Sequence, residues 1–294
     1  MAVPFIGKLV VFGVGLIGGS FAMALKSAGA VGQVVGVGRS RANLERALAR
    51  GAIDAVGEDL AAVLKDADLV FLAVPVAQTP AVMQAIEPHL EPACVITDGG
   101  STKQDVVAAA RLAFGDRIVQ FVPAHPIAGG EHSSVDAADA GLYRNKLVVV
   151  TPLSETEPRA TELVRKAWLA CGVRLAEMTP ADHDAVFAAV SHLPHALAFA
   201  LVEMMAARPN GETLFSFAGA GFRDFTRIAS SSPEMWRDIC LANGPALLRE
   251  IDAYQAALMH LRHLVEAGEG GALAAHFERA RAARNAWLKR RGEA

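Results

Sequence analysis

The stretch Lys8–Ser20 reads KLVVFGVGLIGGS and decides how the chain begins to fold. After Lys8, the four residues to Phe12 are apolar, with two adjacent valines, as in a strand buried within a parallel sheet. Gly13, Gly15 and Gly18 follow at the spacing G-x-G-x-x-G, and apolar residues then recur at helical spacing. Strand, glycine turn and helix in this order predict a dinucleotide-binding unit, in which a pyrophosphate lies at the N-terminus of the helix.

Two other interpretations of this stretch are weaker. A glycine-rich turn between a strand and a helix need not bind anything, but the complete context favours the cofactor site. The uncharged run from Leu9 to Leu25 resembles a membrane or signal segment. Glycines and a serine interrupt this run, which is short for a span and lacks a cleavage site. We therefore expect neither a membrane partner nor a targeting peptide.

The composition indicates a globular protein with a large core. The chain has 294 residues, which is long enough for two domains. Of these residues, 52% are hydrophobic and 20% are charged. A net charge of −3, without a basic run before the C-terminus, argues against a nucleic-acid partner. The three cysteines are far apart and form neither a C-x-x-C pair nor a disulfide framework. This usage predicts a reducing, cytoplasmic location.

Strand and helix patterns alternate as far as residue 178. After 8–12, we expect strands at 33–37, 68–74, 94–97, 118–122, 146–150 and 173–178, with helices between them. This alternation predicts a doubly wound, mostly parallel α/β sheet of the Rossmann type over residues 1–179. From residue 180 to 294 the pattern is helical throughout, which predicts an all-α second domain. Residues 245–264 are apolar on more than one face, so we expect them to pack in a homodimer.

The end of the second expected strand bears on the choice between NAD and NADP. An acidic residue there binds the ribose 2′-hydroxyl of NAD, whereas an arginine suits the 2′-phosphate of NADP. The sequence has Gly38-Arg39-Ser40, which favours NADP. Alternatively, Arg39 stacks on the adenine or lies in solvent, as either cofactor would allow. The predicted cofactor-binding residues are Gly13, Gly15, Leu16, Ile17, Gly18, Arg39, Ser40, Val74 and Pro75.

Two polar clusters follow expected strands, at 98–103 and 125–131. In open parallel sheets, ligands bind outside the carboxyl ends of the strands. His125 lies between Ala124 and Pro126 at such an end, and a histidine is a natural general base at neutral pH. The alternative is a structural histidine that caps the strand.

The second domain contributes Ser191-His192-Leu193-Pro194-His195. Pro194 is expected to break or restart a helix, and in a restarted helix the dipole at His195 would favour an anion. The H-x-x-H spacing lacks both a third ligand and an intervening glutamate, so we expect no zinc.

Residues 219–227 contain a glycine-rich helix entry followed by two arginines one turn apart. Such arginines can hold a carboxylate through paired hydrogen bonds. A surface ion pair between Asp224 and Arg227 explains the pattern equally well.

Taken in order, these motifs resemble the prephenate dehydrogenase family. The resemblance spans about Lys8 to Trp236 and rests on GxGxxGGS, DxGSxK, HPIAGxE, SHLPH and DFTRIA. It implies a Rossmann-type domain, a helical domain that forms the dimer, and a nicotinamide cofactor without a metal. It also implies oxidative decarboxylation of prephenate to 4-hydroxyphenylpyruvate in tyrosine biosynthesis; some members use arogenate, and some use both substrates.

The resemblance assigns roles to six residues. His125 matches the catalytic histidine that takes the proton of the ring hydroxyl, and Ser101 matches the serine that orients it. The implied substrate-binding residues are His195, Arg227, Ser191 and Glu131. The short segments outside the motifs fit the monofunctional form without a mutase or regulatory domain. Feedback by tyrosine would then act at the active site.

Two rival functions are less consistent with the residues. A β-hydroxyacid dehydrogenase of the 6-phosphogluconate type requires a catalytic lysine in the helical domain, and residues 182–205 contain none. A cofactor-sensing protein without catalysis would be expected to lack His125 or Ser101. Both residues are present, so the enzyme is the preferred reading.

Overall fold

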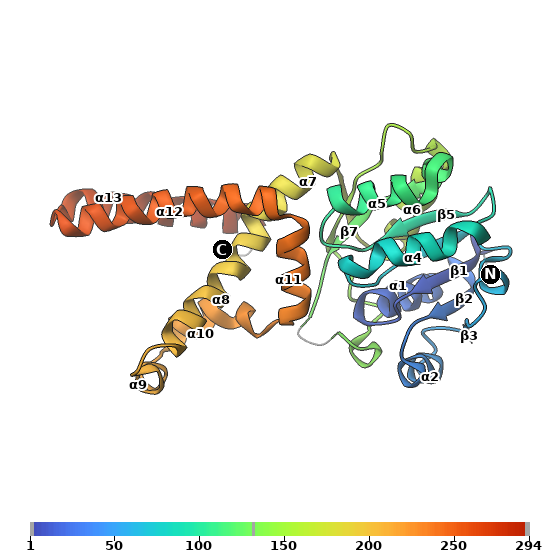
Figure 1. The fold of residues 1–294 in the computed structure, drawn as a ribbon, viewed down its shortest axis with the longest axis horizontal. Coiled ribbons are helices and arrows are strands. Elements are labelled where there is room, and N and C mark those ends of the chain that lie inside the picture. Colours follow the sequence, from blue (N-terminus) through green and yellow to red (C-terminus); the bar gives the residue numbers. More distant parts are fainter. Residues whose placement is uncertain (1–2, 131–132, 292–294) are drawn as a thin grey trace. The chain divides into compact units, whose positions relative to one another are not determined.

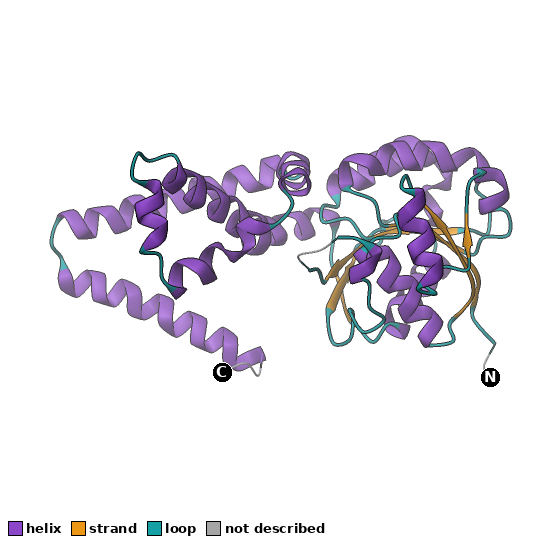
Figure 2. Ribbon diagram, turned by 90° about the horizontal axis from the view of Figure 1, so that it is seen from below, coloured by secondary structure: helices purple, strands orange, loops and turns teal. Residues whose placement is uncertain are grey.

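The structure is a computed structural model that describes residues 3–130 and 133–291. The chain divides into two compact units, Met1–Gly244 and Pro245–Ala294. The first unit contains a six-stranded parallel sheet with helices on both faces (Figures 1 and 2). The order along this sheet is β3 (Ala55–Val56), β2 (Val31–Val37), β1 (Ile6–Phe12), β4 (Leu69–Leu72), β5 (Val95–Asp98) and β6 (Phe121–Val122). The doubly wound fold is thereby confirmed.

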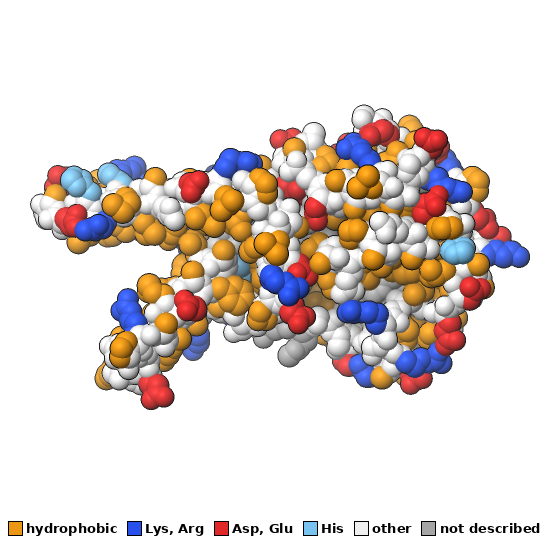
Figure 3. Space-filling view, viewed as in Figure 1, with side chains coloured by type: hydrophobic (Ala, Val, Ile, Leu, Met, Phe, Trp, Pro, Cys, Tyr) orange, Lys and Arg blue, Asp and Glu red, His pale blue; other side chains and the backbone are white. Residues whose placement is uncertain are grey.

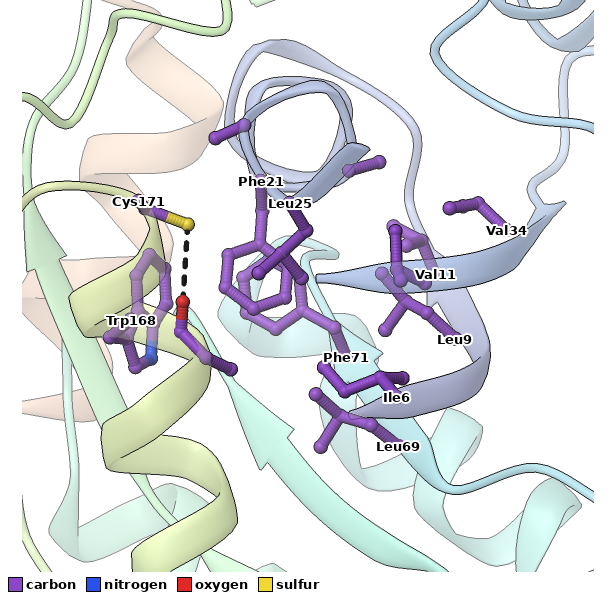
Figure 4. Packing of buried hydrophobic residues seen from close by; sticks show 14 of the residues in the cluster. Ile6, Leu9, Val11, Phe21, Leu25, Val34, Leu69, Phe71, Trp168 and Cys171 are labelled. Carbon is purple, nitrogen blue, oxygen red and sulfur yellow. Dashed lines mark hydrogen bonds between the residues drawn. The ribbon is translucent and has the colours of Figure 1, made fainter. Parts of the chain in front are cut away.

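Both faces of this sheet are buried. Successive side chains of a strand point to opposite faces, so each strand contributes to both hydrophobic clusters. In β1, Leu9 and Val11 join one hydrophobic cluster, while Val10 and Phe12 join the other. On the first face, the ring of Phe21 lies 4.5 Å from those of Phe71 and Trp168 (Figure 4). The uninterrupted apolar runs in the sequence therefore correspond to strands covered on both sides.

Helices connect the parallel strands and supply these covers. Three of them, α1 (Leu16–Ser27), α2 (Arg41–Ala49) and α3 (Leu60–Leu64), follow the first strands, and α4 (Thr79–Ile86), α5 (Gln104–Phe114) and α6 (Pro158–Ala170) come later. Single 3₁₀ turns flank α4 and cover residues 76–78 and 87–89.

The last strands differ from the sequence prediction in two ways. Residues 115–120 form a 3₁₀ helix, so the strand expected from residue 118 begins at Phe121. After Pro123 the chain leaves the parallel sheet and enters a second, three-stranded sheet. This sheet consists of β7 (Ala124–Ile127) antiparallel to β8 (Leu147–Val150), which is parallel to β9 (Arg174–Glu177). Proline supplies no ladder N–H, which is consistent with a change of sheet at this point.

A continuous helical run, Pro180–Ala206, follows β9 and comprises α7 (Pro180–Phe187), a π-helical turn at Ala188–His192 and α8 (Leu193–Ala206). Of the two expectations at Pro194, the restart is the one observed: the chain is not interrupted, and α8 begins at Leu193 with Pro194 in its first turn. The wide turn that precedes the proline removes the need for an ordinary helical hydrogen bond at that position.

By length and a mean hydropathy of 1.8, the run Pro180–Ala206 could cross a membrane. Its buried polar residues His183 and Asp184, however, are hydrogen-bonded to other parts of the first unit. The unit ends with α9 (Gly211–Ser216), α10 (Ala220–Thr226), a 3₁₀ turn over residues 227–230 and α11 (Pro233–Ala242).

The second unit consists of α12 (Gly244–Glu266, counted from Pro245) and α13 (Gly270–Arg291). The rings of His260 and His276 lie 5.7 Å apart, close to the turn that joins the two helices. Large apolar side chains are exposed along them (Figure 3), including Met259 at 57%, Val265 at 61% and Phe277 at 53%. Such a surface on a pair of helices indicates that another surface covers it.

Candidate active site

Four parallel strands end side by side at one edge of the sheet. The register aligns Phe12 with Val37 on one side and with Leu72 on the other, and Leu72 in turn with Asp98. The loops that follow these residues contain the glycine turn, Arg39, Val74–Pro75 and Ser101. The sheet therefore brings the predicted cofactor-binding segments and one predicted catalytic residue to a common edge.

The glycine turn has the shape that the motif predicts. Gly13 has a φ of +92°, and a Cβ there would lie 2.4 Å from the carbonyl oxygen of Ala73. A Cβ on Gly18 would lie 2.2 Å from the carbonyl oxygen of Gly13. Helix α1 begins at Leu16, and the first N–H groups of an α-helix have no partner within the helix. This turn fits the pyrophosphate of a dinucleotide.

In this structure, the close neighbour of Gly15 is the carbonyl oxygen of Ser133. A Cβ at Gly15 would lie 2.6 Å from the carbonyl oxygen of Ser133, and the Leu16 N–H donates to the same oxygen over 2.9 Å. The segment after the predicted catalytic strand thus lies directly over the start of α1.

Arg39 lies at the end of β2 with an exposed side chain. Ser40 caps α2, since its hydroxyl accepts a hydrogen bond from the N–H of Asn43. The neighbouring Arg41 is paired with Glu45 and Glu58, whereas Arg39 forms no ion pair with a described residue. Arg39 is therefore free to meet an anion at the edge of the sheet.

Asp98, at the end of β5, forms a buried ion pair and also contacts β7. Lys103 Nζ lies 2.6 Å from Asp98 Oδ2, and both side chains are almost completely excluded from solvent. The other carboxylate oxygen, Asp98 Oδ1, accepts a hydrogen bond from the Ala124 N–H over 3.0 Å. The residue before His125 is thus held at the end of β5.

His125 itself lies within β7, opposite Val149, and not at the end of a parallel strand as expected. Its Nδ1 is 2.9 Å from Nε2 of His183, and Nδ1 of His183 is 2.8 Å from Oδ1 of Asp184. Asp184 also accepts hydrogen bonds from the backbone N–H groups of Lys103 and Gln104, both over 2.8 Å. These contacts connect the start of the helical run with the cofactor-binding edge.

Burial keeps the histidines of this site neutral. It is the main cause that holds the pKa of His125 well below its usual value, with further contributions from His183 and Lys103. Burial also lowers the pKa of His183, although Asp184 opposes that shift. The pKa of the Asp184 carboxyl is lowered despite its burial, because His183 and two backbone N–H groups donate to it. A neutral imidazole next to a cofactor site can accept a proton.

His192 ties Ser101 to the helices of this unit. It hydrogen-bonds the Ser101 backbone, and its Nδ1 lies 3.1 Å from Nδ2 of Asn243. Burial lowers the pKa of His192 to about 4. No side-chain hydrogen bond joins the described residues Ser101 and His125; His125 hydrogen-bonds to His183 and its ring packs against Phe187 at a centroid separation of 4.8 Å.

His195 lies one turn further along. Its Nδ1 is 2.9 Å from the carbonyl oxygen of Ser191, and its ring stacks on Trp236 with a centroid separation of 3.7 Å. Burial lowers the pKa of His195, and the positive charge of Arg227 lowers it further. The rings of His192 and His195 both lie against Trp236, with centroid separations of 6.1 and 3.7 Å. Glu131 lies outside the described residues.

Comparisons with known proteins identify the family of the chain. The description "Prephenate dehydrogenase, nucleotide-binding domain" matches residues 21–177, and "Prephenate dehydrogenase, dimerization domain" matches residues 179–279. The chain belongs to the prephenate dehydrogenase family. Its Rossmann-type domain and helical second domain are those of the family.

Three relatives illustrate the similarity. Prephenate dehydrogenase of Bacillus subtilis is 36% identical, over 93% of this chain and 74% of its own length. Cyclohexadienyl dehydrogenase of Zymomonas mobilis is 35% identical over 94% of both chains. A crystal structure of the Aquifex aeolicus prephenate dehydrogenase with hydroxyphenyl propionate and NAD+ has a TM-score of 0.89 and 35% identity. It covers 95% of this chain and 97% of its own.

The residues that hold His125 and His195 in place lie outside the motifs of the sequence. His183 and Asp184 contact His125 and α5, and Trp236 supports His195. The sequence Asp182-His183-Asp184 contains a signal, because an acid beside a histidine can orient it. The contacts of His183 and Asp184 are with residues about 60 to 80 positions away, and the sequence does not show which residues these are.

Proposed function

We propose that the protein is a prephenate dehydrogenase that couples oxidation of prephenate to its decarboxylation. The observation that carries this proposal is the position of His125. A neutral imidazole is fixed at the carboxyl edge of a dinucleotide-binding sheet by Asp98 and His183. Family membership supports prephenate as the substrate.

The glycine turn and the N-terminus of α1 fit the pyrophosphate of a nicotinamide cofactor, which supplies the hydride acceptor when bound. In the proposed reaction, His125 Nε2 takes the proton of the ring hydroxyl as the carbinol hydrogen departs as hydride. The ring carboxylate leaves as CO2, its bonding electrons complete the aromatic ring, and His125 returns the proton to the phenolate. The products are 4-hydroxyphenylpyruvate, CO2 and the reduced cofactor.

The remaining substrate contacts are proposals that rest on position. Ser101 lies at the cofactor edge, and Ser191 and His195 share one turn near Trp236. Arg227 supplies a guanidinium near His195 that can hold a carboxylate of the dianionic substrate. Glu131, outside the described residues, is assigned to the same pocket only because it belongs to the HPIAGxE motif.

We further propose NADP as the preferred cofactor, because the end of β2 presents Arg39 and no acidic residue. The alternative substrate is arogenate, which differs from prephenate by an amino group in place of a keto group. A dual-specificity activity is a reasonable alternative because the relative from Zymomonas mobilis is named a cyclohexadienyl dehydrogenase.

The proposal extends to organisation and location. We place the end of the cofactor domain at residue 179 and assign residues 180–294 to substrate binding and dimerisation. A reducing cytoplasm suits the three cysteines, none of which forms a disulfide with another described residue. If tyrosine regulates the enzyme, we propose that it competes with prephenate at the active site.

Turnover tests the proposed function. Purified protein is mixed with prephenate or arogenate and with NAD or NADP, and the absorbance of the reduced cofactor is followed. We expect turnover of prephenate, and a fall of about 10²–10⁴-fold in kcat for His125→Asn, with cofactor binding nearly unchanged. Absence of turnover with either substrate, or a His125→Asn variant at wild-type rate, would contradict the proposal.

A further inference from the structure

The contacts of His125 point to a second pair of residues behind the base. We propose that Asp184 and His183 are positioning residues that fix His125 in one tautomer, with the proton on Nδ1 and the lone pair on Nε2. This inference rests on the proposed role of His125 in prephenate oxidation. It assigns functions to two buried residues of the helical run and specifies the ring nitrogen that meets the substrate.

The argument begins at Asp184, which is 1% exposed. Oδ1 of its carboxylate accepts the N–H of Lys103, and Oδ2 accepts the N–H of Gln104. Two backbone donors from the start of α5 therefore hold the carboxylate in place. An ionised carboxylate can only accept hydrogen bonds, so the contact of 2.8 Å with His183 Nδ1 requires a proton on that nitrogen.

The tautomer of His183 then determines that of His125. A neutral imidazole with a proton on Nδ1 has a lone pair on Nε2. Nε2 of His183 is 2.9 Å from Nδ1 of His125, so His125 must donate from Nδ1. The lone pair of His125 consequently lies on Nε2, which has no hydrogen-bond partner among residues 3–130 and 133–291. This nitrogen is left for the hydroxyl of the substrate.

The surroundings oppose the alternative in which His183 is doubly protonated. His183 is fully buried, and the Lys103 ammonium, itself 0% exposed, adds a positive charge nearby. Were His183 protonated on both nitrogens, His125 Nδ1 would have to accept and Nε2 would carry the proton. A ring in that state cannot take a proton from the substrate. The wrong tautomer of a catalytic histidine is costly in other enzymes that orient it with a carboxylate.

Two substitutions of His183 separate the hydrogen bond from the packing. His183→Phe keeps a ring beside Phe187, whose centroid lies 4.5 Å away, but removes the acceptor for His125. His183→Gln offers a side-chain oxygen as a substitute acceptor. We expect kcat to fall about 10–100-fold in the phenylalanine variant, with the KM values for prephenate and cofactor changed less than about threefold. The glutamine variant is expected to recover most of the rate.

Nitrogen-15 NMR of histidine-labelled protein reads the tautomer directly, and His125→Asn assigns the signal. We expect an unprotonated Nε2 in the wild type and in His183→Gln, and a mixture of tautomers in His183→Phe. Wild-type kcat in His183→Phe, a protonated Nε2 in the wild-type protein, or equal losses in both variants would overturn the inference. Retained cofactor affinity shows that a variant is folded.

His89 is the matched control, because it is an exposed histidine in the cofactor domain. His89→Phe is expected to leave kcat and the His125 signal unchanged. The two proposals fail in different ways. If the wild type does not oxidise prephenate, the proposed function is wrong, while the NMR measurement still tests the tautomer. If His125→Asn is inactive but both His183 variants are fully active, only the positioning role is wrong.

Discussion

Among single residues, Arg227 had two interpretations, a carboxylate-binding role and a surface ion pair, and the structure distinguishes between them. The sequence allowed a surface ion pair between Asp224 and Arg227. In the structure, the ion-pair partner of Asp224 is Arg223, at 3.6 Å. No ion pair joins Arg227 to any residue in 3–130 or 133–291, and its charge acts on His195 instead. A free guanidinium beside the proposed pocket is consistent with a carboxylate-binding role.

Arg227→Lys tests this role because lysine keeps the charge and loses the paired donors. A charge-assisted hydrogen bond contributes about 1.5–3 kcal/mol, so kcat/KM should fall by roughly one to two orders of magnitude. The KM for prephenate should carry most of this loss and the KM for the cofactor little. Arg223→Lys, on the preceding helix α10, is the control. Unchanged steady-state constants in Arg227→Lys would exclude a substrate contact.

Arg39 provides a second residue-level prediction. Arg39→Asp should shift the ratio of kcat/KM values toward NAD, because a carboxylate repels the 2′-phosphate and accepts from the ribose 2′-hydroxyl. The measurement is the pair of constants for NAD and NADP in both proteins. A wild type that already prefers NAD strongly would show that the proposed NADP preference is wrong.

At this scale the sequence revealed residues that lie next to a local signal. Gly13 follows a strand and Gly18 lies in the first turn of the helix, and His125 lies between Ala124 and Pro126. His183 has only its acidic neighbours as a local signal, and these do not reveal its contact with His125, 58 residues earlier. Residues that act through another side chain are defined by the tertiary structure.

At the scale of elements, the helical run Pro180–Ala206 is the least expected feature. A proline near the middle of an apolar helix indicated a break or a restart, and the π-helical turn at Ala188–His192 carries the chain through it. This turn also places His192 against the Ser101 backbone and Asn243. Parallel strands were easier to predict, because burial on both faces produces continuous apolar runs.

The burial of His192 makes this part of the fold sensitive to acid. Its pKa is about 4 in the folded protein and near 6.5 in an unfolded chain, so the unfolded state binds more protons between these values. The contribution of His192 to the free energy of unfolding is therefore complete above about pH 6.5, and it should fall as the pH drops toward 4. A shift of this size corresponds to a loss of about 3 kcal/mol.

Urea unfolding at several pH values measures this effect. The slope of the unfolding free energy against pH between 4 and 6.5 should be smaller in His192→Asn than in the wild type. The exposed His89 supplies the control, since His89→Asn should keep the wild-type slope. Equal slopes in all three proteins would show that His192 titrates alike in the folded and unfolded states.

At the scale of the whole molecule, the exposed apolar surface of the second unit calls for a partner. Helices α12 and α13 bury few large side chains, and Leu248 and Val265 are each 61% exposed. Residues 179–279 match the dimerisation domain of the family, so a second copy of the chain is the proposed partner. The apolar pattern of residues 245–264 predicted this helix from the sequence, whereas the packing of two chains has no signature in one sequence.

We expect light scattering at micromolar concentration to give about twice the chain mass of 30.9 kDa. Met259→Glu places a charge on the apolar surface of α12 and should shift the protein toward the monomer, because burying an unpaired charge is unfavourable. Leu112→Glu is the control, since Leu112 is 88% exposed on α5 of the cofactor domain, and it should leave the mass unchanged. A wild-type monomer would contradict the proposed dimer. An unaffected dimer in Met259→Glu would place the interface on another surface, and loss of the dimer in both variants would point to general destabilisation.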